Sequence, residues 1–249
     1  QEADRVVCHW AFPFPFWAQR QGVQPEALRT WCHGSGLRQP GAGFWLGRTH
    51  AVALVSPHQR RFVPRRFHGA LKLLPVPVAP ALRQSGAVPD RLIFVGRLVR
   101  QKGAHLLSSI LDELPGWTGV VVGDGPEAAA LRKDPRLDCL GALPQGAWAN
   151  RVERGVVVCL STGPEGAPLV VDEARQLGLP VVVSAQLGLA QRVRHEQDGL
   201  IVRGMAPKAW AQAVRQAQAH AGRLTAQPAA HRGCPNGWSS FVDWVAAPN

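Results

Sequence analysis

The stretch Val156–Ser184, VVVCLSTGPEGAPLVVDEARQLGLPVVVS, decides how this chain can fold. Its apolar start predicts a strand over 156–160, and the polar Gly/Pro segment after it predicts a loop. A helix is expected over about 167–177, because Gly178 is a typical helix stop, and a second apolar strand follows over 180–183. Two apolar strands joined through one helix form a parallel βαβ unit.

The start of this helix is a predicted anion site. Pro168 suits the first helical turn, where its missing N–H costs nothing, so the helix should begin at the carboxyl end of the first strand. Free backbone N–H groups and the positive end of the helix dipole favour an anion there. Glu165 lies in the loop, and Glu173 lies roughly 8 Å further along the helix axis. Two carboxylates beside such a helix end favour sugar hydroxyls on either side of a diphosphate, one taking a hexose and the other a ribose.

These residues resemble a known family. EGAPLVVDEA (165–174) followed by GLPVVVS (178–184) is similar to the glutamate, seven residues, glutamate motif of retaining glycosyltransferase family 4, part of glycosyltransferase group 1. The resemblance implies an α/β fold of GT-B type with two Rossmann-like parallel-sheet domains, the first incomplete. It also implies a retaining hexosyltransferase that moves a sugar from a nucleotide-diphosphate sugar to a hydroxyl acceptor. Glu165 would then hold sugar hydroxyls, and Glu173 would hold the ribose.

The domain organisation follows from the pattern of strands and from the same resemblance. Residues 1–79 are expected to form part of an N-terminal acceptor-side domain, and the polar Pro/Gly stretch 80–90 reads as a linker. Residues 91–230 are expected to form the nucleotide-sugar-binding domain, and 231–249 a tail and helix that packs back towards the first domain. The family's first strand and glycine-rich turn have no counterpart before Gln1, so we expect a fragment or a natively short protein.

Strands and helices alternate from Arg91 onward, which predicts a doubly wound parallel sheet with its ligand outside the carboxyl ends of the strands. In the first part of the chain, short strands are expected at 4–9 and 71–78, a second unit is expected to end at WCHGSG (31–36), and a third is expected to run through 49–56. The aromatic, Pro-rich segment 10–18 and the poorly patterned segment 221–235 read as loops. A helix is expected over about 189–195, and a closing helix over 237–245.

Two basic residues are candidates for the donor's diphosphate. VGRLVRQKG (95–103) places Arg97 and Lys102 on a loop that leaves a strand and enters a helix. In the family the matching residues grip the diphosphate, and two cations beside helix N-termini can stabilise a departing nucleoside diphosphate without a metal. The chain has no Asp-x-Asp motif, so we predict no metal and no other cofactor. Under this hypothesis Glu165, His33, Arg97 and Lys102 are the catalytic residues.

The donor sugar itself would meet Gly166 and Ala167, whose N–H groups follow Glu165. The family more often has glycine, an aromatic residue and glycine after this glutamate, whereas here Pro168 removes one N–H, so the sugar preference stays open. VGDGPE (122–127) also resembles a family segment, and we interpret it as structural.

Two histidines near the start of the chain are further candidate site residues. The resemblance implies that His33, in WCHGSG, reaches the hydroxyls of the donor sugar, and His9 is a rival for the same role. The pairs Cys8-His9 and Cys32-His33 also raise zinc as a hypothesis. Adjacent residues on a strand point to opposite faces, and this spacing matches no common zinc finger, so no metal site is predicted.

Composition sets the remaining expectations. Hydrophobic residues make up 46% and charged residues 18% of the 249 residues, which is typical of a folded globular protein. Five cysteines, an odd number, favour a reducing compartment, and we expect a cytoplasmic protein. The net charge of +11 favours phosphate-bearing partners, including the anionic inner face of a membrane.

The expected partners are a nucleotide-sugar donor and a glycan or lipid-linked acceptor, as in the synthesis of cell-envelope polysaccharides. No nucleic-acid-binding motif accompanies the basic charge, so nucleic acid is not an expected partner. The alternative is a catalytically inactive nucleotide-sugar-binding protein or fragment.

Overall fold

The computed structural model describes residues 5–9, 11, 13–33, 37, 39–74, 76, 87–144, 146–163, 165, 168–186, 188–225 and 238–247. The chain divides into two compact units, each considered by itself. Unit 1 comprises 1–77, 165–167 and 231–249, and unit 2 comprises 78–164 and 168–230. Residues 80–86, most of the linker expected over 80–90, lie outside the described residues.

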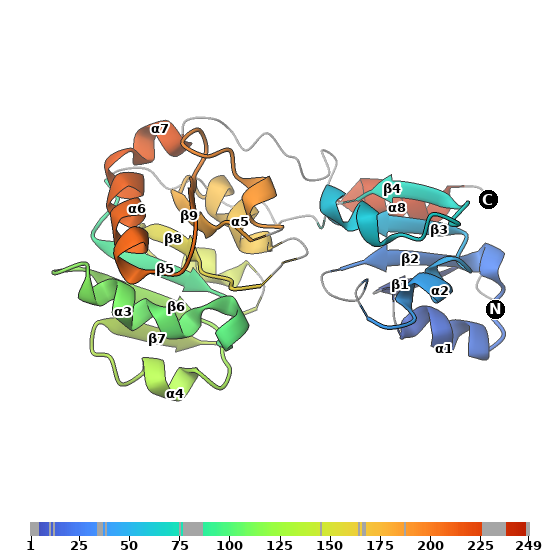
Figure 1. Cartoon of the computed structure of the whole chain (residues 1–249), viewed down its shortest axis with the longest axis horizontal. Helices are drawn as coiled ribbons and strands as arrows, with labels where there is room; N and C mark the ends of the chain where they lie inside the picture. Colours follow the sequence, from blue (N-terminus) through green and yellow to red (C-terminus); the bar gives the residue numbers. More distant parts are fainter. Residues whose placement is uncertain are drawn as a thin grey trace. The chain divides into compact units, whose positions relative to one another are not determined.

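Unit 1 is built on a four-stranded sheet in which every neighbouring pair is parallel (Figure 1). Its strands, in spatial and sequence order, are β1 (Val6–His9), β2 (Leu28–Cys32), β3 (Ala51–Leu54) and β4 (Ala70–Leu73). Because the order is sequential, each connection crosses one face and returns to the next strand. All four carboxyl ends therefore lie at the same edge.

The helical segments of unit 1 correct one expectation. They are α1 (Phe14–Arg20), η1 (Pro25–Ala27), α2 (Ala42–Leu46), η3 (Pro57–Phe62) and α8 (Trp238–Ala246). The aromatic segment 10–18 was expected to be a loop, yet α1 occupies much of it. The two prolines do not prevent this, because Pro13 is the N-cap and Pro15 lies in the first turn, where no intrahelical acceptor is needed.

The last helix, α8, covers one face of this sheet. Trp244 packs there against Trp31 and Leu74, and its side chain is 4% exposed. Two arginines hold the end of α8: Arg5 donates to the carbonyl of Val245 (3.0 Å), and Arg29 donates to that of Ala247 (2.6 Å). A separate core lies among Cys32, Val52, Leu54 and the α2 residues Ala42 and Leu46.

Unit 2 contains a six-stranded, fully parallel sheet of order β10-β9-β8-β5-β6-β7 (Figure 1). The strands are β5 (Arg91–Val95), β6 (Thr118–Val122), β7 (Leu137–Gly141), β8 (Val156–Cys159), β9 (Val181–Ser184) and β10 (Leu200–Val202). The order reverses between β5 and β8, so the crevice at their carboxyl ends is a topological switch point. The expected α/β class with two parallel sheets is confirmed.

Helices cover both faces of the unit 2 sheet. They are η4 (Arg100–Lys102), η5 (Ala104–Leu106), α3 (Leu107–Asp112), α4 (Ala128–Leu131), η6 (Ala147–Asn150), α5 (Leu169–Gln176), η7 (Ala190–Arg192), α6 (Pro207–Ala219) and α7 (Ala221–Thr225). Residues of α3 and α6 share one core cluster, and residues of α5 belong to the other.

Two further expectations were wrong in part. The helix expected over 189–195 is only the turn η7, because the chain is already extended at Val193 and pairs His195 with Gly199 as an isolated bridge. The segment after α6, expected to be a loop, begins with α7, which buries Ala221 and Leu224.

The docking of α8 gives a stability prediction. Trp244→Ala should lower the free energy of unfolding of unit 1 by about 3–5 kcal/mol, because it removes a large buried side chain. Val242→Ala is the control on the same helix, since Val242 is 59% exposed and should cost less than about 0.5 kcal/mol. Urea unfolding followed by circular dichroism measures both. Equal effects would show that α8 is not packed as described.

Candidate functional site

The loops after β5 and β6 pack directly on each other at the carboxyl edge of the unit 2 sheet. The N–H of Gly96 donates to the carbonyl of Val122 (2.9 Å), and the N–H of Leu98 donates to that of Asp124 (2.8 Å). A Cβ on Gly123 would overlap the carbonyl of Gly96, and Gly125 is similarly close to Leu98. The glycines of VGDGPE therefore let two loops cross, in agreement with their interpretation as structural.

The loop after β5 also packs on the loop after β8. Gly103 has φ of +77°, and a Cβ there would overlap the carbonyl of Leu160. The N–H of Thr162 donates to the carbonyl of Gln101 (2.8 Å). The hydroxyl of Ser184, at the end of β9, donates to the carbonyl of Ser161 (2.7 Å). Segments from three strands thus form one hydrogen-bonded surface at the switch point.

Arg97 and Lys102 both lie on this surface, on the loop that follows β5. Arg97 is exposed, and Lys102 is half-buried as the last residue of η4. The carbonyl of Gln101, next to Lys102, accepts the hydrogen bond from the N–H of Thr162. This bond connects the loop with the two cations to the loop that leads towards Glu165. The structure therefore places both cations at the sheet edge where a ligand is expected.

The helix α5 (Leu169–Gln176) begins two residues later than the expected start at about 167. Pro168 is its N-cap (φ −69°, ψ 110°), not a helical residue, so the first free N–H belongs to Leu169. The helix ends in a Schellman motif, in which the N–H of Leu179 reaches the carbonyl of Ala174 (2.8 Å) and Gly178 has φ of +71°. Both ends of α5 are thus defined by local sequence.

The two glutamates of the motif differ in surroundings. Glu165 is half-buried, whereas Glu173, in the second turn of α5, is 7% exposed. The candidate donor-binding residues Gly166 and Ala167 lie outside the described residues.

Trp148 is a partner of Glu173 that the sequence did not reveal. Its indole Nε1 donates to Oε2 of Glu173 at 2.7 Å, and the indole itself is 2% exposed. Burial raises the pKa of Glu173, and the indole hydrogen bond opposes that rise. Trp148 lies on the short turn η6.

The two candidate histidines lie together in unit 1. His9 Nδ1 and His33 Nε2 are 3.2 Å apart, and their rings stack with centroids 5.2 Å apart. Burial, reinforced by the nearby His9, lowers the pKa of His33 to about 4, so its imidazole is neutral at neutral pH. His9 and His33, which the sequence analysis offered as alternatives for contact with the donor sugar, therefore lie side by side.

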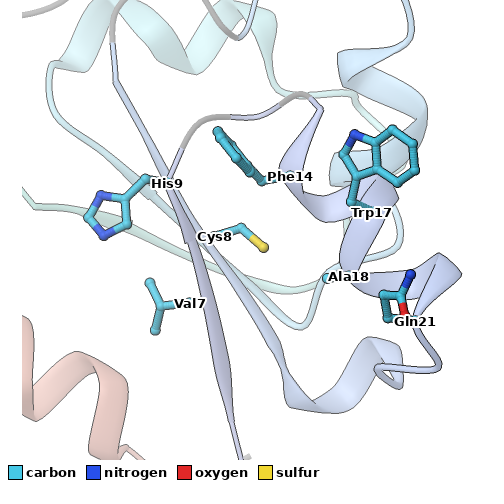
Figure 2. Close-up of a pocket in the computed structure, with 7 residues that line it drawn as sticks. All are labelled: Val7, Cys8, His9, Phe14, Trp17, Ala18 and Gln21. Atoms are coloured by element: carbon cyan, nitrogen blue, oxygen red, sulfur yellow. The ribbon is translucent and has the colours of Figure 1, made fainter.

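The zinc hypothesis gains no support from this arrangement. Figure 2 shows Cys8 on the opposite side of β1 from His9 and Val7, as alternation along a strand requires. Burial raises the pKa of the Cys8 thiol to about 11, which disfavours a thiolate ligand. Within the described part of the chain, no group of three or more His, Cys, Asp or Glu side chains could hold a metal ion.

A cavity of about 460 Å³ lies between β1 and α1. Its lining is Val7, Cys8, His9, Phe14, Trp17, Ala18 and Gln21 (Figure 2). Phe14 and Trp17 are about half exposed, at 49% and 54%. Apart from Cys8 and His9, none of these residues was considered for a site, and Phe14, Trp17 and Ala18 belong to the segment that was expected to be a loop.

The two parallel-sheet units and the switch-point site define a GT-B-type α/β protein. A family model described as "Glycosyl transferases group 1" matches residues 89–220, more than half of the chain, and the chain belongs to this family. A D-inositol 3-phosphate glycosyltransferase of Corynebacterium urealyticum is 28% identical in an alignment 191 residues long, which covers 66% of this chain and 42% of that protein. The chain spans less than half the length of the curated relatives it matches.

Solved structures share the fold. Anabaena HepE in complex with UDP and glucose has a TM-score of 0.75 at 18% identity, over 94% of this chain and 74% of that chain. The lipopolysaccharide outer core galactosyltransferase WaaB has a TM-score of 0.72 at 16% identity, over 98% and 75%. Among the described residues, no helix is long and apolar enough to cross a membrane.

The crossing of loops at Gly103 can be tested. Gly103→Ala should destabilise unit 2 by at least about 2 kcal/mol more than Gly116→Ala, because backbone at Leu160 must move to admit the methyl group. Gly116 is the matched control: its φ is +83°, but no atom lies within 4 Å of a Cβ there, so only the backbone strain of about 1–2 kcal/mol remains. Thermal unfolding compares them, and equal losses would contradict the close approach.

Burial of Glu173 gives a pH prediction. Its folded-state pKa lies above the ordinary 4.5, so ionisation costs stability as the pH rises from that value through the raised pKa. Glu173→Gln should therefore be more stable than the parent protein at about pH 8, and the difference should vanish near pH 4. Urea unfolding across this range measures it. Glu113→Gln, at an exposed glutamate, is the control substitution, and a constant difference for Glu173→Gln would refute the assignment.

Proposed function

We propose that the protein is a retaining glycosyltransferase of family 4, which moves a hexose from a nucleotide-diphosphate sugar to a hydroxyl acceptor. The observation that carries the proposal is the hydrogen-bonded surface at the switch point of unit 2. There, the loop with Arg97 and Lys102 is tied to the loop leading to the two-glutamate motif. Membership of glycosyl transferases group 1 supports the proposal, and HepE with UDP and glucose is a structural precedent for such a donor.

Arg97 and Lys102 are proposed to bind the donor's diphosphate. Two cations compensate the charge that develops on the leaving diphosphate as the glycosidic bond breaks, and they need not reorganise to do so. With this much positive charge in place, we propose that transfer needs no metal. Unit 2 then supplies the leaving-group stabilisation from its own side chains.

The glutamates are proposed to hold the two sugars of the donor. Glu173 would accept hydrogen bonds from the ribose hydroxyls, while the indole of Trp148 keeps one carboxylate oxygen in position. Glu165, with the backbone N–H groups of Gly166 and Ala167, would orient the hexose. Hydroxyls are donors to carboxylates, so this arrangement recognises both sugars by the same chemistry.

His33 is proposed to hydrogen-bond to hydroxyls of the donor sugar as a neutral imidazole, which can both donate and accept. In the proposed reaction the diphosphate leaves as the acceptor hydroxyl attacks the anomeric carbon from the same face, which retains configuration. The hydroxyl's proton passes to the departing phosphate oxygen, so the charges balance without a covalent enzyme intermediate.

The proposed acceptor is a glycan, a glycolipid or a small molecule of cell-envelope polysaccharide synthesis. The fold shared with WaaB, a lipopolysaccharide galactosyltransferase, supports this class of acceptor. The cluster RRFVPRRFH (60–68), where Arg60, Arg61, Arg65 and Arg66 are exposed, supports peripheral contact with anionic lipid on the cytoplasmic face of a membrane.

Calorimetric titration with UDP, GDP and ADP tests the donor site. One nucleotide should bind equally well with EDTA and with magnesium. Lys102→Ala and Glu173→Ala should each weaken binding about 10–100-fold, because each removes a charge-assisted hydrogen bond. Lys133→Ala, an exposed lysine of unit 2, is the control and should change nothing. Binding that requires magnesium, or that survives both substitutions, would overturn these assignments.

A further inference from the structure

We propose that one face of unit 1 docks on an anionic lipid bilayer, with aromatic rings entering the membrane interface and arginines binding the headgroup phosphates. This face, hereafter the α1–α2 face, is formed by α1, α2 and residues 60–68. The inference deepens the membrane contact of the proposed function, because it adds an apolar component to the basic cluster and defines which side of unit 1 meets the lipid. It rests on that function only for the location of the acceptor.

A row of aromatic rings runs from α1 to α2, which lie beside each other in unit 1 (Figure 1). The ring of Phe16 lies 5.2 Å from that of Trp17 and 4.9 Å from that of Trp45, centroid to centroid. The Trp45 ring in turn lies 4.9 Å from that of Phe44. Both ends of the row are exposed, Trp17 at 54% and Phe44 at 43%. A contiguous apolar surface of this kind marks an interaction site.

Two arginines stack on this row. The guanidinium of Arg48 lies 3.7 Å from the centre of the Phe44 ring, and that of Arg20 lies 5.8 Å from the centre of the Phe16 ring. Both arginines are exposed. The side chain of Gln19 donates to the carbonyl of Arg48 (3.2 Å), which connects α1 to α2. A guanidinium stacked on a ring can still donate from its edge to phosphate oxygens, so apolar and cationic groups share one surface.

The basic segment 60–68 borders the same helices. A Cβ added to Gly47, just after α2, would lie 3.9 Å from Nε of Arg66, and one added to Gly43 would lie 3.3 Å from Pro64. The segment therefore packs against α2 and extends the α1–α2 face. It adds four exposed cations, Arg60, Arg61, Arg65 and Arg66.

The charge of this part of the chain is complementary to an anionic bilayer. Residues 1–77 contain ten arginines and lysines but three acidic residues. Among the described residues between 5 and 76, Glu26 is the one acidic residue. An anionic leaflet attracts basic residues near its surface, and aromatic rings beside them can enter the interface while the guanidinium groups stay with the phosphates.

The geometry of the rings favours lipid over nucleic acid. A single strand would need open ring faces on which its bases could stack. Arg48 already covers one face of Phe44, and Trp45 meets that ring edge to face at 90°. Insertion into a membrane interface requires apolar area and no open face, so this arrangement suits a bilayer.

Docking through the α1–α2 face leaves the histidine pair uncovered. Helix α2 packs on the side of the sheet that carries Cys32 and Val52, whereas Trp31 belongs to the opposite side, under α8. The rings of His9 and His33 both contact Trp31. The histidines therefore lie on the sheet side away from the proposed membrane contact.

Co-sedimentation of the full chain with lipid vesicles tests the cationic part without any donor. The parent protein should bind phosphatidylcholine vesicles that contain about 30% phosphatidylglycerol, and should bind pure phosphatidylcholine at least about tenfold more weakly. The double variant Arg65→Ala/Arg66→Ala should weaken binding about 10–30-fold in about 0.15 M salt, because each arginine contributes about fivefold. Arg132→Ala/Arg223→Ala, at two exposed arginines of unit 2, is the matched control and should change binding less than about twofold.

The aromatic part is tested at high salt. In about 0.5 M salt, where charges are screened, Phe44→Ala should weaken the remaining binding about tenfold, because an apolar ring no longer leaves water. Phe44→Trp keeps a large ring and should retain binding. Val242→Ala, at an exposed apolar residue of α8, is the control and should match the parent protein. An unchanged circular dichroism spectrum establishes that Phe44→Ala is folded.

Three outcomes would overturn the inference: no binding of the parent protein to the mixed vesicles, equal losses in the unit 2 control, or a dimer that dissociates in Phe44→Ala. In the last case a second copy, not lipid, would cover the rings. A parent protein that binds a nucleotide but no vesicles would likewise overturn the inference and leave the donor site intact. Vesicle binding without nucleotide binding would instead support this inference and contradict the proposed function.

Discussion

Close packing of the loop after β5 against its neighbours is the constraint on which the proposed donor site depends. A parallel sheet gathers the ends of its strands at one edge, but side chains normally keep the following loops apart. Here Gly103 and Gly123 allow backbone to meet backbone. The cations Arg97 and Lys102 are thus carried on a chain segment supported from both sides. A supported loop loses less conformational freedom when a ligand binds, which favours affinity.

Burial of the Glu173 carboxylate lowers the stability of unit 2. A carboxylate that is 7% exposed costs free energy when it ionises, and one indole hydrogen bond compensates only part of that cost. If the only role of this position were to stabilise α5, an apolar side chain would stabilise the helix more than a buried carboxylate does. The arrangement makes sense where a ligand brings further hydrogen-bond donors, such as the hydroxyls of a ribose, to a carboxylate already positioned by Trp148.

The regular part of the fold was predictable, and the reasons differ between elements. Strands buried on both faces are continuous apolar runs, so the sheet after Arg91 could be read directly. Helix α1 could not, because an aromatic, proline-rich segment resembles a loop; Pro13 is in fact the N-cap and Pro15 lies in the first turn, where a helix tolerates proline. The contact of Trp148 with Glu173 joins residues 25 positions apart, and the pairing of His9 with His33 depends on strand register. Neither contact can be predicted from the local sequence pattern, because each joins residues that are far apart in the chain.

Helix α8 links the last described segment of the chain to the histidine pair. The guanidinium of Arg29 is 2% exposed, and burial, together with the nearby Arg5, lowers its pKa. This cost is offset at the end of α8, where the carbonyl of Ala247 accepts from Arg29 and the negative end of the helix dipole favours a cation. The same helix packs Phe241 against Trp31, and Trp31 packs against His33. The docking of α8 therefore also helps to position the two imidazoles. A shift of Phe241 on α8 is therefore transmitted to the histidine pair through the ring of Trp31.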